Sequence, residues 1–297
     1  MTFQRYLPHL ALIGANLIWA FAYPLYSLVM PRHINAEAML CATLICTAIL
    51  SLIPLLWKKG EKVHRRDIAP LVGAAILIAI IRKGMLLLGV SMTSPIDASI
   101  ISTISPIVVL IISVVIGIDS FNSRKIIGLL AGTVGAVGVI LTGVSPSHAG
   151  SSMMGNILVL ICAFITAIYI VWFKSLLKRY EPLTILRWTF CIAAILYTPF
   201  GIEPLLKSDL SGLEPLHLAA LLYAIIMPTY IPNLLQNYAL QYVQPTISSI
   251  YTYLRPLVAG AITIYMGLDT PQFDTIIYAL LIFFGVGVVI ISYNKTR

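Results

Sequence analysis

Apolar segments about as long as a membrane-crossing helix recur along the whole chain, and they constrain its fold more than any other feature. A helix needs roughly 20 apolar residues to cross the hydrocarbon core of a bilayer. Ten segments fit that length, at residues 9–29, 36–57, 67–89, 95–117, 124–143, 154–176, 182–200, 214–238, 245–267 and 273–293. The sequence therefore predicts an all-α integral membrane protein with ten transmembrane helices.

The composition excludes a water-soluble globular protein. Charged residues make up 10% of the chain and the mean hydropathy is +0.96, whereas soluble proteins carry about 25% charged residues. The net charge of +8 comes without the basic run that is typical of nucleic-acid binding. We expect the lipid bilayer as a partner and no nucleic acid.

The charges in the loops predict the orientation of the chain. With the N-terminus inside, the inner loops and ends hold thirteen Lys and Arg residues, and the outer loops hold only Arg32 and Lys207. Lys and Arg accumulate in cytoplasmic loops. Both termini are therefore expected in the cytoplasm, in a plasma membrane of the bacterial inner-membrane type.

The second half of the chain repeats the first. A shift of 150 residues aligns 95–143 with 245–293 without a gap. Each half has five segments, and an odd number makes the second copy enter from the opposite side of the membrane. We predict two inverted five-helix repeats, residues 1–147 and 148–297, which is the architecture of many alternating-access carriers. The alternative is a duplication that only builds a bundle. The informative aligned pairs are Pro95/Pro245, Ser99/Ser249, Pro106/Pro256, Gly117/Gly267, Asp119/Asp269 and Gly135/Gly285.

Several motifs resemble the EamA-type half of the drug/metabolite transporter superfamily, and together they span nearly the whole chain. They are Trp19-Ala20, Gly89 to Pro106, Gly117-Ile118-Asp119, Gly128 to Gly143, Ala239 to Tyr242, Arg255-Pro256 and Gly267-Leu268-Asp269. The resemblance implies a bundle in which spans one, three, four, six, eight and nine line a central cavity, with spans five and ten outside it. The chain departs from the family pattern at Asp119 and Asp269, where Glu is frequent, and at Arg255, where an acidic or small residue is frequent.

Polar and aromatic side chains recur at helical spacing on several spans. Facing lipid they would lack hydrogen-bond partners, so we expect them to face the interior. Arg255 lies about 15 Å into its span, where a charge costs at least about 2.5–3.5 kcal/mol. We predict that it binds an anionic part of a solute; the alternative is a fixed ion pair with an acid. The other predicted solute-binding residues are Trp19, Tyr23, Lys83, Ser102, Tyr169, Tyr230, Asn233, Asn237 and Tyr251.

Two other groups of residues each allow two interpretations. Lys83 or Arg82 either pairs with Asp97 across a short loop or faces the cavity. Pro106 and Pro256 remove backbone hydrogen bonds inside their spans, so they are predicted as hinges or as kinks that only shape the packing.

Gly128, Gly132 and Gly135 form a small-residue face on one span. Such a face serves close packing within the bundle, which we prefer, or a dimer surface. The protein is accordingly expected to be a monomer or a homodimer.

The sequence contains no Ser-His-Asp set, metal-spaced His/Glu cluster or nucleotide loop, so we expect no catalytic residue, metal or cofactor. Only one acid, Asp97, falls inside a segment, which favours facilitated diffusion or exchange over proton symport driven by a buried carboxylate. The predicted function is a carrier of small polar organic solutes, namely amino acids or related organic acids. The alternatives are an exporter of hydrophobic drugs or cations, a membrane-embedded enzyme, and a lipid scramblase.

Overall fold

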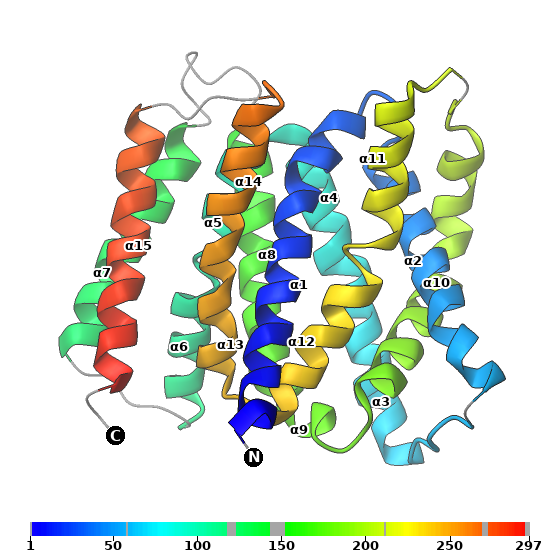
Figure 1. Ribbon diagram of the computed structural model, residues 1–297, viewed down its shortest axis with the longest axis horizontal. Helices are drawn as coiled ribbons and strands as arrows, with labels where there is room; N and C mark the ends of the chain where they lie inside the picture. Colours follow the sequence, from blue (N-terminus) through cyan, green and yellow to red (C-terminus); the bar gives the residue numbers. More distant parts are fainter. Residues whose placement is uncertain are drawn as a thin grey trace.

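The computed structural model describes residues 2–57, 59–117, 123–142, 152–210, 212–268 and 273–294. Within these ranges the chain is all-helical and contains no β-strand. The long helices run side by side, and α1 begins at the same end of the bundle at which α15 ends (Figure 1). The predicted boundary between the halves, at residues 147 and 148, lies outside the described residues, as do Asp119 and Asp269.

The helices follow one another with short connections. In order they are α1 (Thr2–Val29), α2 (Ala36–Leu52), η1 (Ile53–Leu56), α3 (Arg65–Ala74), the π-helix η2 (Ala75–Arg82), α4 (Lys83–Met92), α5 (Pro95–Ser102), α6 (Ser105–Val115), α7 (Ser123–Thr142), α8 (Met153–Trp172), α9 (Lys174–Leu177), α10 (Pro182–Leu206), α11 (Pro215–Ile226), α12 (Tyr230–Tyr242), α13 (Pro245–Ile250), η3 (Tyr251–Tyr253), α14 (Leu254–Tyr265) and α15 (Phe273–Asn294).

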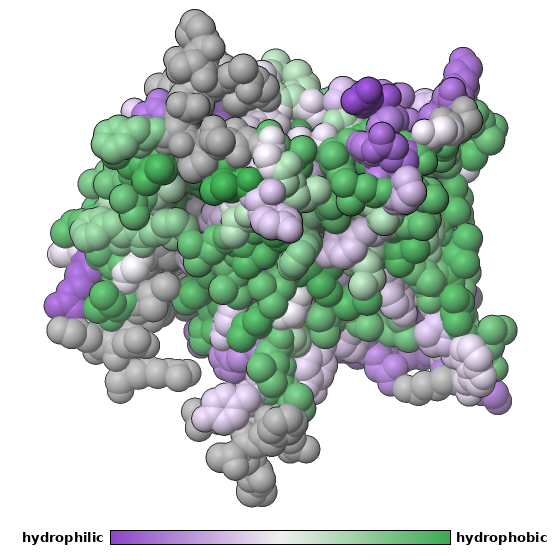
Figure 2. All heavy atoms as spheres, turned by 45° about the horizontal axis from the view of Figure 1, so that its top comes forward, coloured by the Kyte–Doolittle hydropathy of each residue, from purple (hydrophilic) through white to green (hydrophobic). Residues whose placement is uncertain are grey.

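Seven helical stretches of the described residues are long and apolar enough to cross a membrane. Each coincides with a segment predicted from the sequence: Tyr6–Val29, Ala36–Leu56, Arg65–Met92, Pro95–Val115, Met153–Trp172, Pro182–Leu206 and Pro215–Tyr242. The three other predicted segments coincide with α7, with α13–η3–α14 and with α15. On the face shown in Figure 2, apolar residues cover most of the middle of the surface and hydrophilic residues gather towards the rims. This distribution suits a protein that is surrounded by lipid.

Proline and short polar side chains start the helices. Proline stands in the first turn of α5, α10, α11 and α13, where its missing N–H costs nothing. Asn35 caps α2 by accepting a hydrogen bond from the Ala38 amide at 2.8 Å. Ser94 caps α5 and Ser152 caps α8 in the same way, at 3.1 and 3.0 Å. The local sequence thus determines where these helices begin.

Two spans are interrupted at positions that the 150-residue shift relates. Thr103 and Ile104 separate α5 from α6, and η3 separates α13 from α14. Pro106 and Pro256 follow these interruptions, and each lacks the N–H that would continue the helix. The Tyr253 hydroxyl in η3 donates a hydrogen bond of 3.0 Å to the Thr103 carbonyl. The interruption η3 therefore supplies a donor for a backbone carbonyl that lacks its helical partner at the break between α5 and α6.

Helices α7 and α15 pack directly against each other at one edge of the bundle (Figure 1). A Cβ atom at Gly285 would lie 2.5 Å from the Gly128 carbonyl oxygen and 2.6 Å from the Gly132 nitrogen. A Cβ atom at Gly135 would lie 2.7 Å from the Tyr278 carbonyl oxygen. The prediction that these glycines serve close packing within the bundle is confirmed.

A polar network ties α3, α9 and α12 together at the end of the bundle where α1 begins. Buried Asp67 pairs with Arg179 at 2.9 Å and accepts a hydrogen bond of 2.6 Å from the Tyr180 hydroxyl. This donation raises the pKa of Tyr180, because ionising the hydroxyl would place two negative charges in contact. Gln241 on α12 donates to the carbonyls of Leu177 and Tyr180, at 2.9 and 2.8 Å. The network joins segments of both halves of the chain.

Candidate solute cavity

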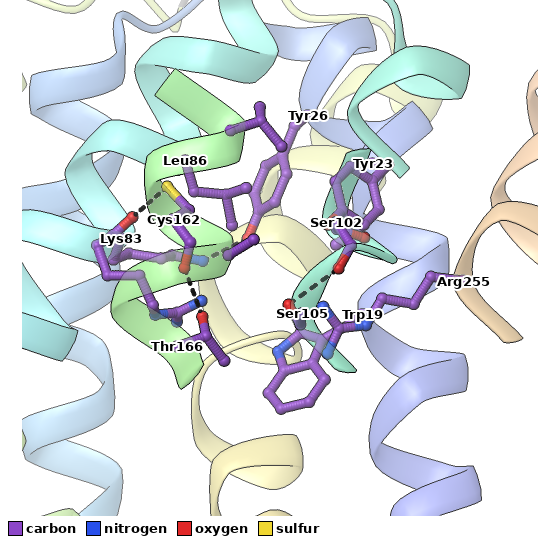
Figure 3. A pocket seen from close by; sticks show the side chains of 14 residues that line it. Trp19, Tyr23, Tyr26, Lys83, Leu86, Ser102, Ser105, Cys162, Thr166 and Arg255 are labelled. Carbon is purple, nitrogen blue, oxygen red and sulfur yellow. Dashed lines mark hydrogen bonds between the residues drawn. The ribbon is translucent and has the colours of Figure 1, made fainter. Parts of the chain in front are cut away.

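A cavity of about 30 Å³ lies inside the bundle between α1, the η2–α4 junction, α5–α6, α8 and α14 (Figure 3). These elements belong to the predicted spans one, three, four, six and nine. A volume of this size holds about one or two water molecules, whereas ligand pockets measure about 300–1,000 Å³. The cavity in the described conformation is therefore smaller than an ordinary ligand pocket. The lining residues are Trp19, Ala22, Tyr23, Tyr26, Arg82, Lys83, Leu86, Ser102, Ser105, Val159, Cys162, Ala163, Thr166 and Arg255.

Arg255 reaches this cavity from α14 and is held by residues of α1. Its Nε donates to the Asn16 side-chain oxygen at 2.8 Å, and its guanidinium carbon lies 4.5 Å from the centre of the Trp19 ring. The guanidinium also interacts with the Tyr23 side chain. All three partners are uncharged, so within the described part of the chain the alternative of a fixed ion pair with an acid is not found at Arg255. Hydrogen bonding and cation–π contact orient the group without neutralising it.

Trp19 is itself fixed by the break between α11 and α12. Pro232 cannot donate the helical hydrogen bond to the Pro228 carbonyl, and the Trp19 indole N–H donates to that carbonyl instead, at 2.8 Å. Asn233 donates to the neighbouring Thr229 carbonyl at 2.6 Å. The break between α11 and α12 and the hydrogen bond from the Trp19 indole therefore hold the Trp19 ring against Arg255.

Lys83 enters the cavity from the side opposite Arg255 (Figure 3). Only 4% of the residue is exposed, and its Nζ donates a hydrogen bond of 2.6 Å to the Tyr26 hydroxyl. Of the two interpretations left open for Lys83, the structure thus supports the one in which it faces the cavity, where it contacts Tyr26 of α1. Its neighbour Arg82 ends the π-helix η2 and also lines the cavity. Such π-turns are frequent at functional sites.

The cavity is positively charged. Arg82, Lys83 and Arg255 line it, and no Asp or Glu is among the lining residues of the described chain. Arginine stays charged in proteins and buried charges normally occur in opposite pairs, so Arg82 and Arg255 without a lining carboxylate favour the entry of an anion.

The hydroxyl-bearing lining residues are already hydrogen-bonded to their own helices. Ser102 donates to the Ser99 carbonyl at 2.7 Å, Ser105 to the Ser102 carbonyl at 3.0 Å, and Thr166 to the Cys162 carbonyl at 2.7 Å. Each oxygen keeps lone pairs that can accept a further hydrogen bond. These side chains suit the polar body of a solute more than its charged end.

Five predicted solute-binding residues line the cavity: Trp19, Tyr23, Lys83, Ser102 and Arg255. The other five lie elsewhere in this conformation, and their contact with a solute stays a prediction. The Tyr251 hydroxyl lies 2.6 Å from His9 Nδ1, and the Tyr169 hydroxyl donates to the Asn237 side-chain oxygen at 3.1 Å. Asn233 donates to the Thr229 carbonyl at the break between α11 and α12. Tyr230 is half-buried against the apolar core. Tyr251 lies in the interruption η3, and Asn233 and Asn237 follow the break between α11 and α12, whereas Tyr169 belongs to the continuous helix α8.

Nine of the fourteen lining residues of the described chain were not in the predicted set. They include Tyr26, Cys162 and Arg82, of which Arg82 was predicted only as the alternative to Lys83. Two adjacent cations in the middle of an apolar segment were the available signal for Arg82. Nothing in the local pattern distinguished Cys162 from the other cysteines.

The comparisons with known proteins decide the family. A model of the EamA-like transporter family matches residues 7–141 and again residues 153–291. The chain belongs to the EamA-like transporter family. The resemblance expected from the sequence motifs is thus confirmed, including the assignment to the drug/metabolite transporter superfamily. The protein is a multi-pass membrane transporter.

Two relatives are described as uncharacterized transporters of Archaeoglobus fulgidus. One is 25% identical over 285 residues, which cover 94% of this chain and 95% of the relative. The other is 27% identical over 141 residues, 48% of this chain and 49% of the relative. A solved crystal structure superposes with a TM-score of 0.67 over 96% of this chain and 97% of that chain, at 16% identity. The solved structure shows that this EamA-like chain shares a known fold.

Proposed function

We propose that this EamA-like transporter carries small polar organic solutes with an acidic group, amino acids or related organic acids, by alternating access. The observation that carries the proposal is Arg255, a guanidinium at the cavity whose described partners are all uncharged. A carboxylate can form two parallel hydrogen bonds with a guanidinium. Arg255 is therefore the docking group, and the small-molecule solute is the partner that its setting fits.

The electrostatics disfavour the rival function, export of hydrophobic cations. Like charges about 6 Å apart repel by about 3 kcal/mol at an effective dielectric of about 20. A cationic drug would meet Arg82, Lys83 and Arg255 without a lining carboxylate to offset them in the described chain. An enzyme or a lipid scramblase is the remaining alternative class, and the transporter family of the chain argues for a carrier instead.

The proposed architecture is ten transmembrane helices in two inverted five-helix repeats, placed in a bacterial inner membrane with both termini in the cytoplasm. Three observations support it. The family model matches twice along the chain. The helix interruptions before Pro106 and Pro256 are related by the repeat shift. Helix α1 begins and α15 ends at the end of the bundle where α3 and α9 lie (Figure 1), and these two helices contain the basic residues Arg65, Arg66 and Lys174.

A solute of amino-acid size needs more room than the cavity of about 30 Å³, so helices have to move apart to admit it. The proposed hinges are the interruptions before Pro106 and Pro256, where the backbone hydrogen-bond ladder is already broken. The cavity also lacks a carboxylate among its described lining residues. We therefore propose a facilitator or an exchanger rather than a proton symporter driven by a buried acid.

The test is binding and transport by the purified full chain. Thermal stabilisation by a panel of amino acids, organic acids, nucleobases and cations identifies the class of ligand, and counterflow in liposomes measures exchange. Arg255→Gln is expected to weaken acid binding about tenfold or more, since a hydrogen bond to a charged group contributes about 1.5–3 kcal/mol. Arg255→Lys, which keeps the charge, is the matched control and loses less.

Two results would contradict the proposal. Stabilisation by lipophilic cations alone would overturn the solute class. Accumulation of solute against its gradient with only a pH difference across the membrane would overturn the facilitator or exchanger mechanism.

A further inference from the structure

The positive groups of the cavity stand on two opposite walls. Arg255 enters from α14, and Lys83 enters from the start of α4 on the other side (Figure 3). Arg82 precedes Lys83 in the chain and lines the same cavity. A solute in the cavity is therefore in contact with cationic groups at both of its ends.

Both walls retain hydrogen-bond donors for a ligand. Among the described residues, Nε of Arg255 donates to the Asn16 side-chain oxygen, and Nζ of Lys83 donates one hydrogen to the Tyr26 hydroxyl. A guanidinium has five N–H donors and an ammonium three. No hydrogen bond from the Arg82 side chain is found within the described residues. Arginine also stays charged in proteins, so a fixed positive charge exists on each wall.

This arrangement discriminates between two kinds of acid. An amino acid that docks its carboxylate on Arg255 brings its ammonium towards Arg82 and Lys83, and no lining carboxylate of the described chain receives it. Two like charges about 6 Å apart repel by the equivalent of about a hundredfold in affinity at an effective dielectric of about 20. An acid with a second carboxylate in place of the ammonium is instead attracted by Arg82 and Lys83.

We propose that the cargo of this cavity carries two separate carboxylates, one bound by Arg255 and the other by the Arg82–Lys83 pair on the opposite wall. This inference rests on the proposed function and selects within it: dicarboxylic acids are carried in preference to zwitterionic amino acids. Two carboxylates also offset the fixed positive charges of Arg255 and Arg82, whereas one carboxylate offsets only one of them.

The experiment compares three ligands that share one acid end and differ only at the other. Glutarate ends in a second carboxylate, 4-aminobutyrate has an ammonium in its place, and butyrate has neither. Binding to the purified full chain is measured by titration calorimetry and thermal shift. We expect glutarate to bind at least about tenfold more tightly than 4-aminobutyrate, with butyrate between them.

Substitutions locate the second subsite. Arg82→Gln is expected to bring the glutarate-to-butyrate affinity ratio close to one, and Arg82→Lys to keep most of it. Lys83→Gln is the second variant if Arg82→Gln fails to fold. Lys207→Gln removes a positive charge whose side chain is 74% exposed, and it is expected to leave the ratio as it is in the parent chain.

The outcomes separate this inference from the proposed function. If 4-aminobutyrate or butyrate binds as tightly as glutarate, and this binding depends on Arg255, the two-carboxylate inference is overturned and the carrier of acidic solutes stands. An unchanged ratio in Arg82→Gln overturns it as well. If none of the three acids binds while another acid of the panel binds through Arg255, only the two-carboxylate inference is overturned; if lipophilic cations alone bind, both proposals fail.

Discussion

Replacing Gly285 by alanine is expected to force α7 and α15 apart. The added Cβ would lie 2.5 Å from the Gly128 carbonyl oxygen and 2.6 Å from the Gly132 nitrogen. Carbon and oxygen atoms in weak contact stand about 3.3 Å apart, so the two backbones have to separate by about 0.8 Å. Both nearby atoms belong to helical backbone and cannot rotate away. A separation of this size loses a quarter to a half of the dispersion attraction across the contact, and overpacking costs about 1–3 kcal/mol.

A second glycine of the same helix provides the matched control. A Cβ at Gly287 has no neighbour within 4 Å. Alanine favours a helix over glycine by about 1 kcal/mol at either position, so this gain cancels when the two variants are compared. The difference between Gly285→Ala and Gly287→Ala therefore isolates the clash of about 1–3 kcal/mol.

Thermal unfolding of the purified protein in detergent measures this difference. Gly285→Ala is expected to unfold several degrees below Gly287→Ala, which should match or exceed the parent chain. The close approach of α7 and α15 would be refuted if Gly285→Ala unfolded at the same temperature as Gly287→Ala or above it.

Three further predictions concern the polar contacts between helices. Tyr253→Phe removes the donor to the Thr103 carbonyl and should lower the free energy of unfolding by about 1–3 kcal/mol. The control Tyr265→Phe changes an exposed tyrosine and should leave the free energy of unfolding as it is. Equal effects of the two substitutions would contradict the role of the Tyr253 hydrogen bond. Asp67→Asn loses a buried ion pair and the charged acceptor of Tyr180, so its melting temperature should fall below that of the parent. The pKa of Tyr180 is raised in the folded state, so the hydrogen bond of its hydroxyl stabilises the fold in full below about pH 10, the usual pKa of tyrosine. This stabilisation is lost as the pH rises through the pKa of the folded state. Unfolding curves measured at alkaline pH should show this loss in the parent chain and not in Tyr180→Phe.

Local sequence pattern determined the class of the protein and the places where its helices begin. Apolar length gave the spans, because the thickness of the bilayer sets the length of a helix that crosses it. Capping residues such as Ser94 and Ser152 act on the first turn beside them, so their effect is visible without tertiary structure. The repeat shift also located both helix interruptions through Pro106 and Pro256.

The make-up of the cavity was decided only by the tertiary structure. Helical periodicity assumes an unbroken α-helix, and the π-helix η2 and the interruption η3 change which side chains face inwards. Tyr251 was therefore expected in the cavity and contacts His9 instead, while Arg82 lines the cavity with Arg255 although they are far apart in the chain. Which residues meet across a bundle depends on how each helix is rotated and packed against its neighbours. A single span does not encode that rotation, because the contacts that set it come from other helices.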